Sequence, residues 1–179
     1  MKKLILIALL SFAIGATAQD SANKIFLELV NTHRANHRLK PVEYSAILDS
    51  ATTLHVNWMV AADTLAHYEY PLTQDGVYYT GPLTRLEKFD KNWKNHFKGI
   101  KENGGAHYQT CSNYNSLKQI KIDRAIIVLI FDQWVKSNSH NTALLDPSVT
   151  VAAFDINGGY NAAKRKFAAY ANCLFAVKL

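Results

Sequence analysis

Three short fragments carry the side chains of this sequence that suit metal binding or acid–base chemistry. Two contain a histidine, His67 in AHYE and His140 in KSNSH, and one contains a carboxylate, Glu102 in KENGG. Each side chain follows a predicted helix end or precedes a Gly-Gly pair, so it can project from an ordered terminus. Two neutral imidazoles and one carboxylate suit Zn²⁺, with a fourth position open to water. We therefore expect His67, Glu102 and His140 to meet in one cleft, with the histidines as ligands of Zn²⁺ or another divalent cation.

The same residues also allow a structural interpretation, in which the two histidines form only a hydrogen-bonded cluster. His33 and His55 lie on the apolar sides of predicted helices, and for them a hydrogen-bonded core position is the better interpretation. Metal binding at His67 and His140 should weaken below about pH 6, because a protonated imidazole cannot bind a metal. Zn²⁺ titration therefore distinguishes the two interpretations.

Helices are predicted upstream of these fragments. Apolar residues recur at helical spacing over residues 21–38 and again after Ser45, a plausible N-cap. The second helix weakens near Asp63, which leaves His67 just beyond its end. The run IIVLIF at residues 126–131 could form a strand buried on both faces, but helical spacing and a capping Asp123 favour a helix.

Residues 70–101 are predicted to form a long connection rich in aromatic side chains. A loop of this length is unusual unless it packs against the core or binds a ligand. We expect Tyr79 and Trp93 to line a groove for a lipid-like or glycan ligand, although the segment could equally cover the core. Gly104 and Gly105 are expected to let the backbone turn tightly after Glu102.

The C-terminal part reads as two strands, residues 150–156 and 167–177, joined by a loop that starts at Asn157-Gly158-Gly159. Helices followed by strands, with no repeat or linker, predict one α+β domain over residues 19–179.

Residues 1–18 are predicted to be a signal peptide. Lys2 and Lys3 precede an apolar run that is too short for a stop-transfer helix, and small residues follow it. Cleavage would leave 161 residues and lower the formal charge from +6 to +4. The chain is therefore expected to be secreted or periplasmic and not an integral membrane protein. It contains no basic and aromatic module for nucleic-acid binding.

Two cysteines remain after the predicted cleavage, Cys111 and Cys173. An even number in an oxidising compartment favours a disulfide between them. A catalytic Cys–His pair is the alternative, but Cys173 lies inside an apolar, strand-like run.

Taken in order, these fragments resemble the CAP superfamily, also called the SCP domain, in its bacterial exported form. LVNTHRANHRLKPVEYSAILDSATTLHVNWM resembles its opening two helices, AHYE its Ser-His-Thr-Gly fragment and KENGG its Gly-Glu-Asn fragment. FDQWVKSNSHNTALLDPSVTVAAFDI resembles Trp-x-x-Ser-x-Gly-His followed by Leu-x-x-Pro and a strand. The resemblance covers nearly all of the predicted mature chain.

The resemblance implies a three-layer α-β-α sandwich and a cleft with two histidines and two acidic residues. His67, Glu102 and His140 match three of these positions, and Ser137 stands where eukaryotic members have the second glutamate. Lys101 and Ser139 replace glycines that the family usually has. The cleft of this chain is therefore expected to contain fewer acidic residues than the two that the family implies.

The family is better known for binding than for one reaction, so the first hypothesis is an exported binding module with a metal-capable cleft. A second hypothesis is a metal-dependent hydrolase in which His67 and His140 hold Zn²⁺ and Glu102 is the general base. No His-Glu-x-x-His sequence supports that enzyme directly. A third hypothesis is a structural or adhesion domain with no active cleft.

Overall fold

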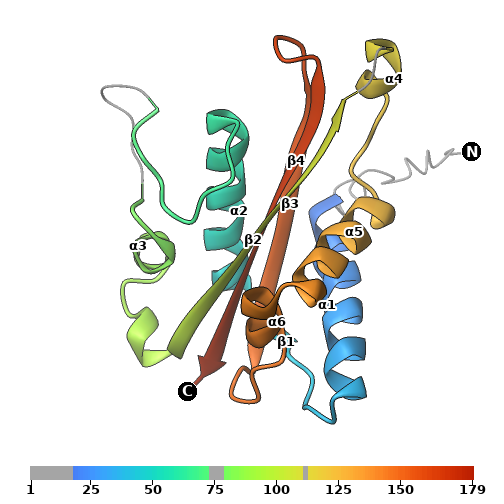
Figure 1. Cartoon of the computed structure of the whole chain (residues 1–179). Coiled ribbons are helices and arrows are strands. Elements are labelled where there is room, and N and C mark those ends of the chain that lie inside the picture. The colour runs from blue at the N-terminus through green and yellow to red at the C-terminus, as the bar shows by residue number, and fades with distance from the viewer. Residues whose placement is uncertain (1–17, 73–78, 111–112) are drawn as a thin grey trace, which may run out of the picture.

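The computed structural model describes residues 18–72, 79–110 and 113–179. Helices lie on both sides of a four-stranded sheet with strand order β1-β3-β4-β2 (Figure 1). β1 is parallel to β3, and the other neighbouring strands are antiparallel. The elements in chain order are α1 (Ala18–Asn36), β1 (Glu43–Tyr44), α2 (Ala46–Ala62), α3 (Pro82–Phe89), η1 (Trp93–Asn95), β2 (Phe97–Thr110), α4 (Tyr114–Lys118), α5 (Arg124–Lys136), α6 (Asn138–Leu144), β3 (Val151–Asn161) and β4 (Lys166–Lys178). The predicted α+β class and three-layer α-β-α sandwich are confirmed.

β4 is buried along most of its length because it faces helices on both sides of the sheet. Phe167, Cys173 and Phe175 belong to the core cluster that includes residues of α1 and α5. Tyr170 and Leu174 point to the other face, where they pack with residues of α2. The alternation follows from the period of two in a strand, and it divides the core into two halves.

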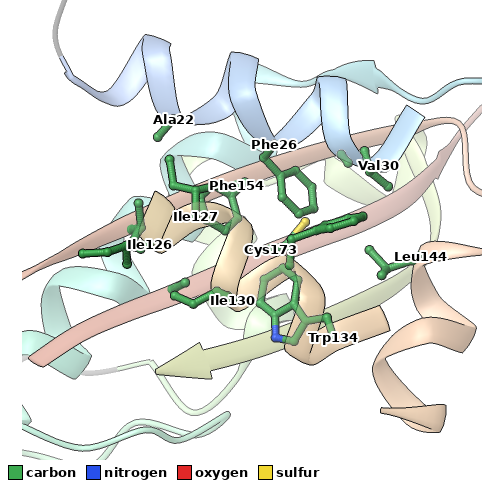
Figure 2. Close-up of a cluster of buried hydrophobic side chains, with 14 of the residues drawn as sticks. Ala22, Phe26, Val30, Ile126, Ile127, Ile130, Trp134, Leu144, Phe154 and Cys173 are labelled. Atoms are coloured by element: carbon green, nitrogen blue, oxygen red, sulfur yellow. The ribbon is translucent and has the colours of Figure 1, made fainter. Parts of the chain in front are cut away.

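Aromatic side chains fill the half of the core between α1, α5 and the sheet (Figure 2). The rings of Phe26 and Phe154 stack at a centroid distance of 4.6 Å. Trp134 meets Phe26 edge-on at 5.8 Å. Such pairs contribute about 0.5–1.5 kcal/mol beyond the burial of their area. Trp134 is thereby fixed in the core while its indole N–H reaches toward β2.

The predicted disulfide is not seen, since Cys173 is a free thiol that is completely buried. Cys111 lies outside the described residues. The strand register gives a physical reason: Cys173 is opposite Asn103, whereas Thr110 is opposite Lys166, near the other end of β4. Seven residues of strand correspond to about 23 Å, so Thr110 lies far from Cys173 along the sheet.

The N-caps predicted for two helices are present in the structure. The Ser45 hydroxyl accepts from the N–H of Leu48 at 3.5 Å and caps α2. The Asp123 carboxylate accepts from the N–H groups of Ala125 and Ile126 at 2.9 and 3.2 Å. These bonds satisfy donors that a helix leaves unpaired at its first turn. The segment IIVLIF is therefore part of α5, as expected.

The expected turn after Glu102 is wrong, because Gly104 and Gly105 lie inside the long strand β2. A Cβ on Gly105 would be 3.0 Å from both the Ile130 Cγ2 atom and the Trp134 Nε1 atom. Glycine is required at this position for close approach of α5, not for a turn. In KENGG apolar residues recur neither at helical spacing nor at every second position, so the sequence did not indicate a strand here.

The expected strand pair at the C-terminus is present but longer than predicted. β3 extends through Asn157-Gly158-Gly159 to Asn161, and the connection to β4 is only residues 162–165. His140 also differs from expectation, because it lies within the short helix α6 and not in a turn.

A buried arginine ties the end of α1 to the loop between α6 and β3. Arg34 is completely buried, and within the described part of the chain its guanidinium donates to main-chain carbonyls alone. The accepting carbonyls are those of Lys40 at 2.8 Å, Leu144 at 2.8 Å, Asp146 at 3.0 Å and Val149 at 3.2 Å. Burial lowers the pKa of Arg34, and the nearby Asp146 carboxylate partly offsets this.

Candidate functional site

The structure brings His67 and Glu102 together. His67 lies in the loop after α2, and its Nδ1 is 3.0 Å from the Glu102 Oε2 atom on β2. The His67 side chain is 51% exposed, whereas that of Glu102 is 6% exposed. The hydrogen bond to Glu102 raises the pKa of His67 against the opposing effect of burial. The pair therefore presents a fixed, half-exposed imidazole above a buried carboxylate.

Two further buried groups hold the other oxygen of Glu102. Arg85, from α3, forms an ion pair through Nη2 with Oε1, and the side-chain amide of Asn172 on β4 donates to the same oxygen at 2.9 Å. Burial alone would raise the pKa of Glu102. The hydrogen bond from His67 and the charge of Arg85 outweigh it, so the pKa of Glu102 lies below its usual value.

Arg85 also organises the loop that carries His67. Its Nη1 lies 3.5 Å from the Glu69 Oε1 atom, 3.1 Å from the His55 Nδ1 atom and 3.3 Å from the His67 carbonyl. His55 lies 2.9 Å from the same Glu69 oxygen and 2.7 Å from the Ala66 carbonyl through its other ring nitrogen. His55 is thus a hydrogen-bonded core histidine, and the loop is anchored on both sides of His67.

His140 is positioned by α6 and its N-cap. Its Nδ1 is 2.9 Å from the Ser137 hydroxyl, and its carbonyl accepts from the side-chain amide of Asn103 at 3.1 Å. The ring stacks on Trp134 at a centroid distance of 6.2 Å. Burial lowers the pKa of His140, and the positive charge of His67 lowers it further.

The two histidines approach this part of β2 from opposite faces. A Cβ on Gly104 would point to the His67 ring, with Cε1 3.6 Å away, whereas Gly105 faces Trp134. The Trp134 indole N–H donates to the Gly104 carbonyl at 2.8 Å, and His140 stacks on that indole. Because β2 is an edge strand, groups from both layers of helices can meet there.

The other predicted site residues have different roles. Trp93 is 7% exposed and packs in the core, so the expectation that it lines a groove is wrong. Tyr79 is half-buried: its N–H donates to Glu69 at 2.8 Å, and its ring lies under the Lys88 ammonium. Ser137 is close to the site, where it orients the His140 ring.

An apolar surface that was not predicted lies in the His67 loop. Four side chains, which we call the 65–72 strip, are exposed: Leu65 by 44%, Tyr68 by 71%, Tyr70 by 49% and Leu72 by 43%. A Cβ on Gly104 would lie 3.3 Å from Leu65, so the strip begins directly beside β2. Apolar side chains gathered at a polar site commonly mark a binding surface.

Sequence reasoning missed Arg85, Glu69 and Asn172, which hold the site from behind. Arg85 lies in the helix PLTRLEKF, where its neighbours give no sign that the arginine points inward. Asn172 is the only polar residue in the run FAAYANCLFAV, and this isolated carboxamide in an apolar strand was the one usable signal.

Comparison with known families identifies the chain. A sequence model described as CAP, the cysteine-rich secretory protein family, matches residues 27–175. The chain belongs to the CAP family. No curated protein sequence matches it significantly. The match includes His67, Glu102 and His140, so the CAP region contains the whole candidate site.

Solved structures show the same CAP fold at low sequence identity. An outer surface protein from Borrelia burgdorferi is 15% identical with a TM-score of 0.61, and the alignment covers 91% of this chain and 97% of that one. An extracellular SCP-domain protein from Bacillus anthracis is 15% identical with a TM-score of 0.58, covering 88% of this chain and 41% of that one. A cysteine-rich secretory protein from Staphylococcus aureus is 17% identical with a TM-score of 0.53, covering 92% and 41%. These CAP neighbours include proteins of extracellular type.

Within residues 18–72, 79–110 and 113–179, no group of three or more His, Cys, Asp or Glu side chains could surround a metal ion. Over the same ranges, no helix has the length and apolar character needed to cross a bilayer.

Proposed function

We propose that this CAP domain is an exported, extracytoplasmic binding module whose binding point is the His67 ring. The observation that carries the proposal is the geometry of that ring. A buried carboxylate, Glu102, accepts from Nδ1, while Nε2 has no hydrogen-bond partner among the described residues. When the imidazole is neutral, its proton is therefore on Nδ1 and the Nε2 lone pair is available to a ligand.

We further propose that Nε2 of His67 and of His140 bind a divalent cation such as Zn²⁺. A carboxylate that accepts from the far nitrogen orients a metal-binding histidine and increases its basicity, which is the role of Glu102 here. Ser137 is placed to do the same for His140. Glu102 does not fit as a third ligand, because its two oxygens already bond His67, Arg85 and Asn172. Two protein ligands imply an open, exchangeable site with water in the other positions.

The 65–72 strip supports a lipid-like or glycan ligand beside that point. Tyr68 is the most exposed member, and aromatic rings serve both acyl chains and sugar faces. The strip replaces Tyr79 and Trp93 as the proposed groove surface, because Trp93 is a core residue. A polar or anionic group of the ligand would then face His67, and its apolar part would lie along the strip.

The hydrolase hypothesis has weaker support. A general base works best with a pKa near the operating pH. The pKa of Glu102 is lowered, and the carboxylate is held by Arg85 on its inner side. Glu102 is therefore better suited to orienting His67 than to accepting a proton from water. A structural or adhesion domain would not require an imidazole nitrogen that is available to a ligand.

Calorimetric titration of Zn²⁺ into metal-free protein tests the cation proposal. His67→Ala and His140→Ala should each abolish most of the binding. His96→Ala is a matched control, because His96 is also half-exposed and also has a carboxylate, Asp90, at 2.6 Å from Nδ1. Equal binding by the wild type and the two site variants would leave only a structural role for the histidines.

A second titration tests the ligand surface. A fluorescent fatty acid and an N-acetylglucosamine oligosaccharide represent the two ligand classes. Tyr68→Ala should weaken the binding of one of them by about tenfold, or about 1.4 kcal/mol, with little change in melting temperature, because the ring is largely exposed. If neither molecule binds the wild type, the 65–72 strip is not a surface for these ligands.

A further inference from the structure

The outer edge of the sheet has unpaired main-chain groups at one end. Among the described strands β2 pairs only with β4, so its other side has no strand partner within residues 18–72, 79–110 and 113–179. In an antiparallel pair, alternate residues direct both N–H and C=O toward the partner strand or away from it. The Gly104 carbonyl accepts from the Trp134 indole of α5, and we infer from this bond that it is one of the groups directed away from β4. The main-chain groups of Ala106, Tyr108 and Thr110 therefore also point outward, and in the described chain no other residue bonds them.

The two halves of this edge differ in charge. The half near the start of β2 has Lys98 and Lys101, with a register shift between them. Lysines and irregular pairing are the usual features that prevent edge strands from joining. The other half, residues 106–110 with sequence AHYQT, has no lysine, arginine, acidic residue or proline. Like charges would oppose self-pairing of the first half, and nothing comparable opposes it in the second.

Exposure increases toward the end of this half of the edge. In Figure 1 the upper part of β2 leads toward α4, and residues 108–110 are exposed. Tyr108 is 49% exposed there. The Lys166 ammonium lies 4.8 Å from the centroid of the Tyr108 ring and is paired with Asp63 at 3.2 Å. The edge is thus accessible and locally close to neutral.

We propose that two copies of this chain associate by pairing residues 106–110 of β2 antiparallel across a twofold axis at Tyr108. In this register Tyr108 faces Tyr108 of the partner subunit, and Ala106 faces Thr110 of the partner subunit. These are the residues whose N–H and C=O point outward, so each donor meets an acceptor and the register is self-complementary. A twofold contact of this kind closes on itself, which limits the assembly to a dimer.

Sedimentation of the purified chain over a concentration series tests the proposal. The average mass should rise from one copy toward two as concentration increases. Tyr108→Pro removes an outward N–H without removing a bond to β4, and it should weaken the dimer by about tenfold or more. Tyr108→Thr is the matched control, since it removes the ring but keeps the N–H. It should weaken the dimer less than proline does.

Hydrogen exchange supplies a measurement that needs no variant. The amides of Ala106, Tyr108 and Thr110 should exchange quickly in dilute protein and become protected in concentrated protein. The alternate amides, which bond β4, should be protected at both concentrations. A constant monomer mass up to the highest attainable concentration would overturn the proposal. So would a dimer in which the outward amides stay unprotected.

Discussion

The indole Nε1 of Trp134 donates to the carbonyl of Gly104 over 2.8 Å, across the edge of the sheet. This bond joins the two sides of the candidate site, because His67 packs near Gly104 and His140 stacks on Trp134. The distance between the two imidazoles therefore depends on how closely α5 packs against β2. Residues that control this packing should affect the site even though they touch no ligand.

Gly105→Ala should destabilise the protein by about 1–3 kcal/mol, because the added methyl group would overpack the contact between α5 and β2. Its Cβ would lie 3.0 Å from both Ile130 and Trp134. The measurement is urea unfolding with Gly159→Ala as control, since a Cβ on Gly159 has nothing within 4 Å. Equal stability of the two variants would mean that α5 can shift without cost.

Glu102→Gln should lower the pKa of His67 toward the ordinary value of 6.5, because the hydrogen bond to the carboxylate is the main cause of its increase. NMR titration of the His67 ring measures this directly. The substitution also leaves Arg85 with one buried carboxylate fewer, so the free energy of unfolding should fall by about 3 kcal/mol. An unchanged His67 pKa would show that the imidazole does not sense Glu102.

Cation binding should weaken at a higher pH than an ordinary histidine would give. The raised pKa of His67 keeps its ring protonated above pH 6.5, and a protonated ring cannot bind a metal. Zn²⁺ affinity should thus fall as pH decreases through that raised value, and not only below the pH of about 6 expected from sequence. Calorimetry at a series of pH values checks this. Binding that is constant from pH 8 to 6 would contradict it.

Acid unfolding should depend on Asp63 at the end of α2. Burial alone would raise the pKa of its carboxylate, but bonds from Lys164, Tyr170 and Lys166 lower it from 3.8 to about 2. A lowered carboxylate pKa stabilises the fold above pH 3.8, and this contribution is lost as pH falls through about 2. Between pH 3.8 and about 2, the melting temperature of Asp63→Asn should therefore fall less than that of the wild type. The same steep loss in the variant would assign it to other carboxylates.

Cys173 should be unreactive in the native protein. Burial raises the pKa of its thiol, and reagents require the exposed thiolate. Iodoacetamide followed by peptide mapping should label Cys173 only after denaturant is added. A non-reduced peptide that links Cys111 to Cys173 would instead establish the disulfide predicted from the sequence.

Features set by local chemistry could be predicted from sequence. Ser45 and Asp123 were correctly predicted as caps, because a capping side chain bonds an N–H only two or three residues away. The pairing of His67 with Glu102, which lie 35 residues apart, is not local; the positions of their fragments and the resemblance to the CAP family both indicated it.

Features set by distant packing could not be predicted. Trp93 resembles an exposed loop aromatic in sequence, but it is buried in a cluster that contains residues of α2, α3 and the sheet. Arg85 is surrounded by Leu83 and Leu86, but Leu83 is exposed and the arginine is buried. Its inward orientation depends on two carboxylates, Glu69 and Glu102, that neighbouring residues do not reveal.

In the loop from Leu144 to Val149, the guanidinium of Arg34 donates to three main-chain carbonyls. Its three bonds there do not depend on which side chains the loop carries. Homologous sequences can therefore diverge freely at the exposed positions of this loop, Pro147 and Ser148, as long as its length is kept. The loop could accordingly be exchanged for one of equal length to alter the surface that follows α6, while insertions would be poorly tolerated.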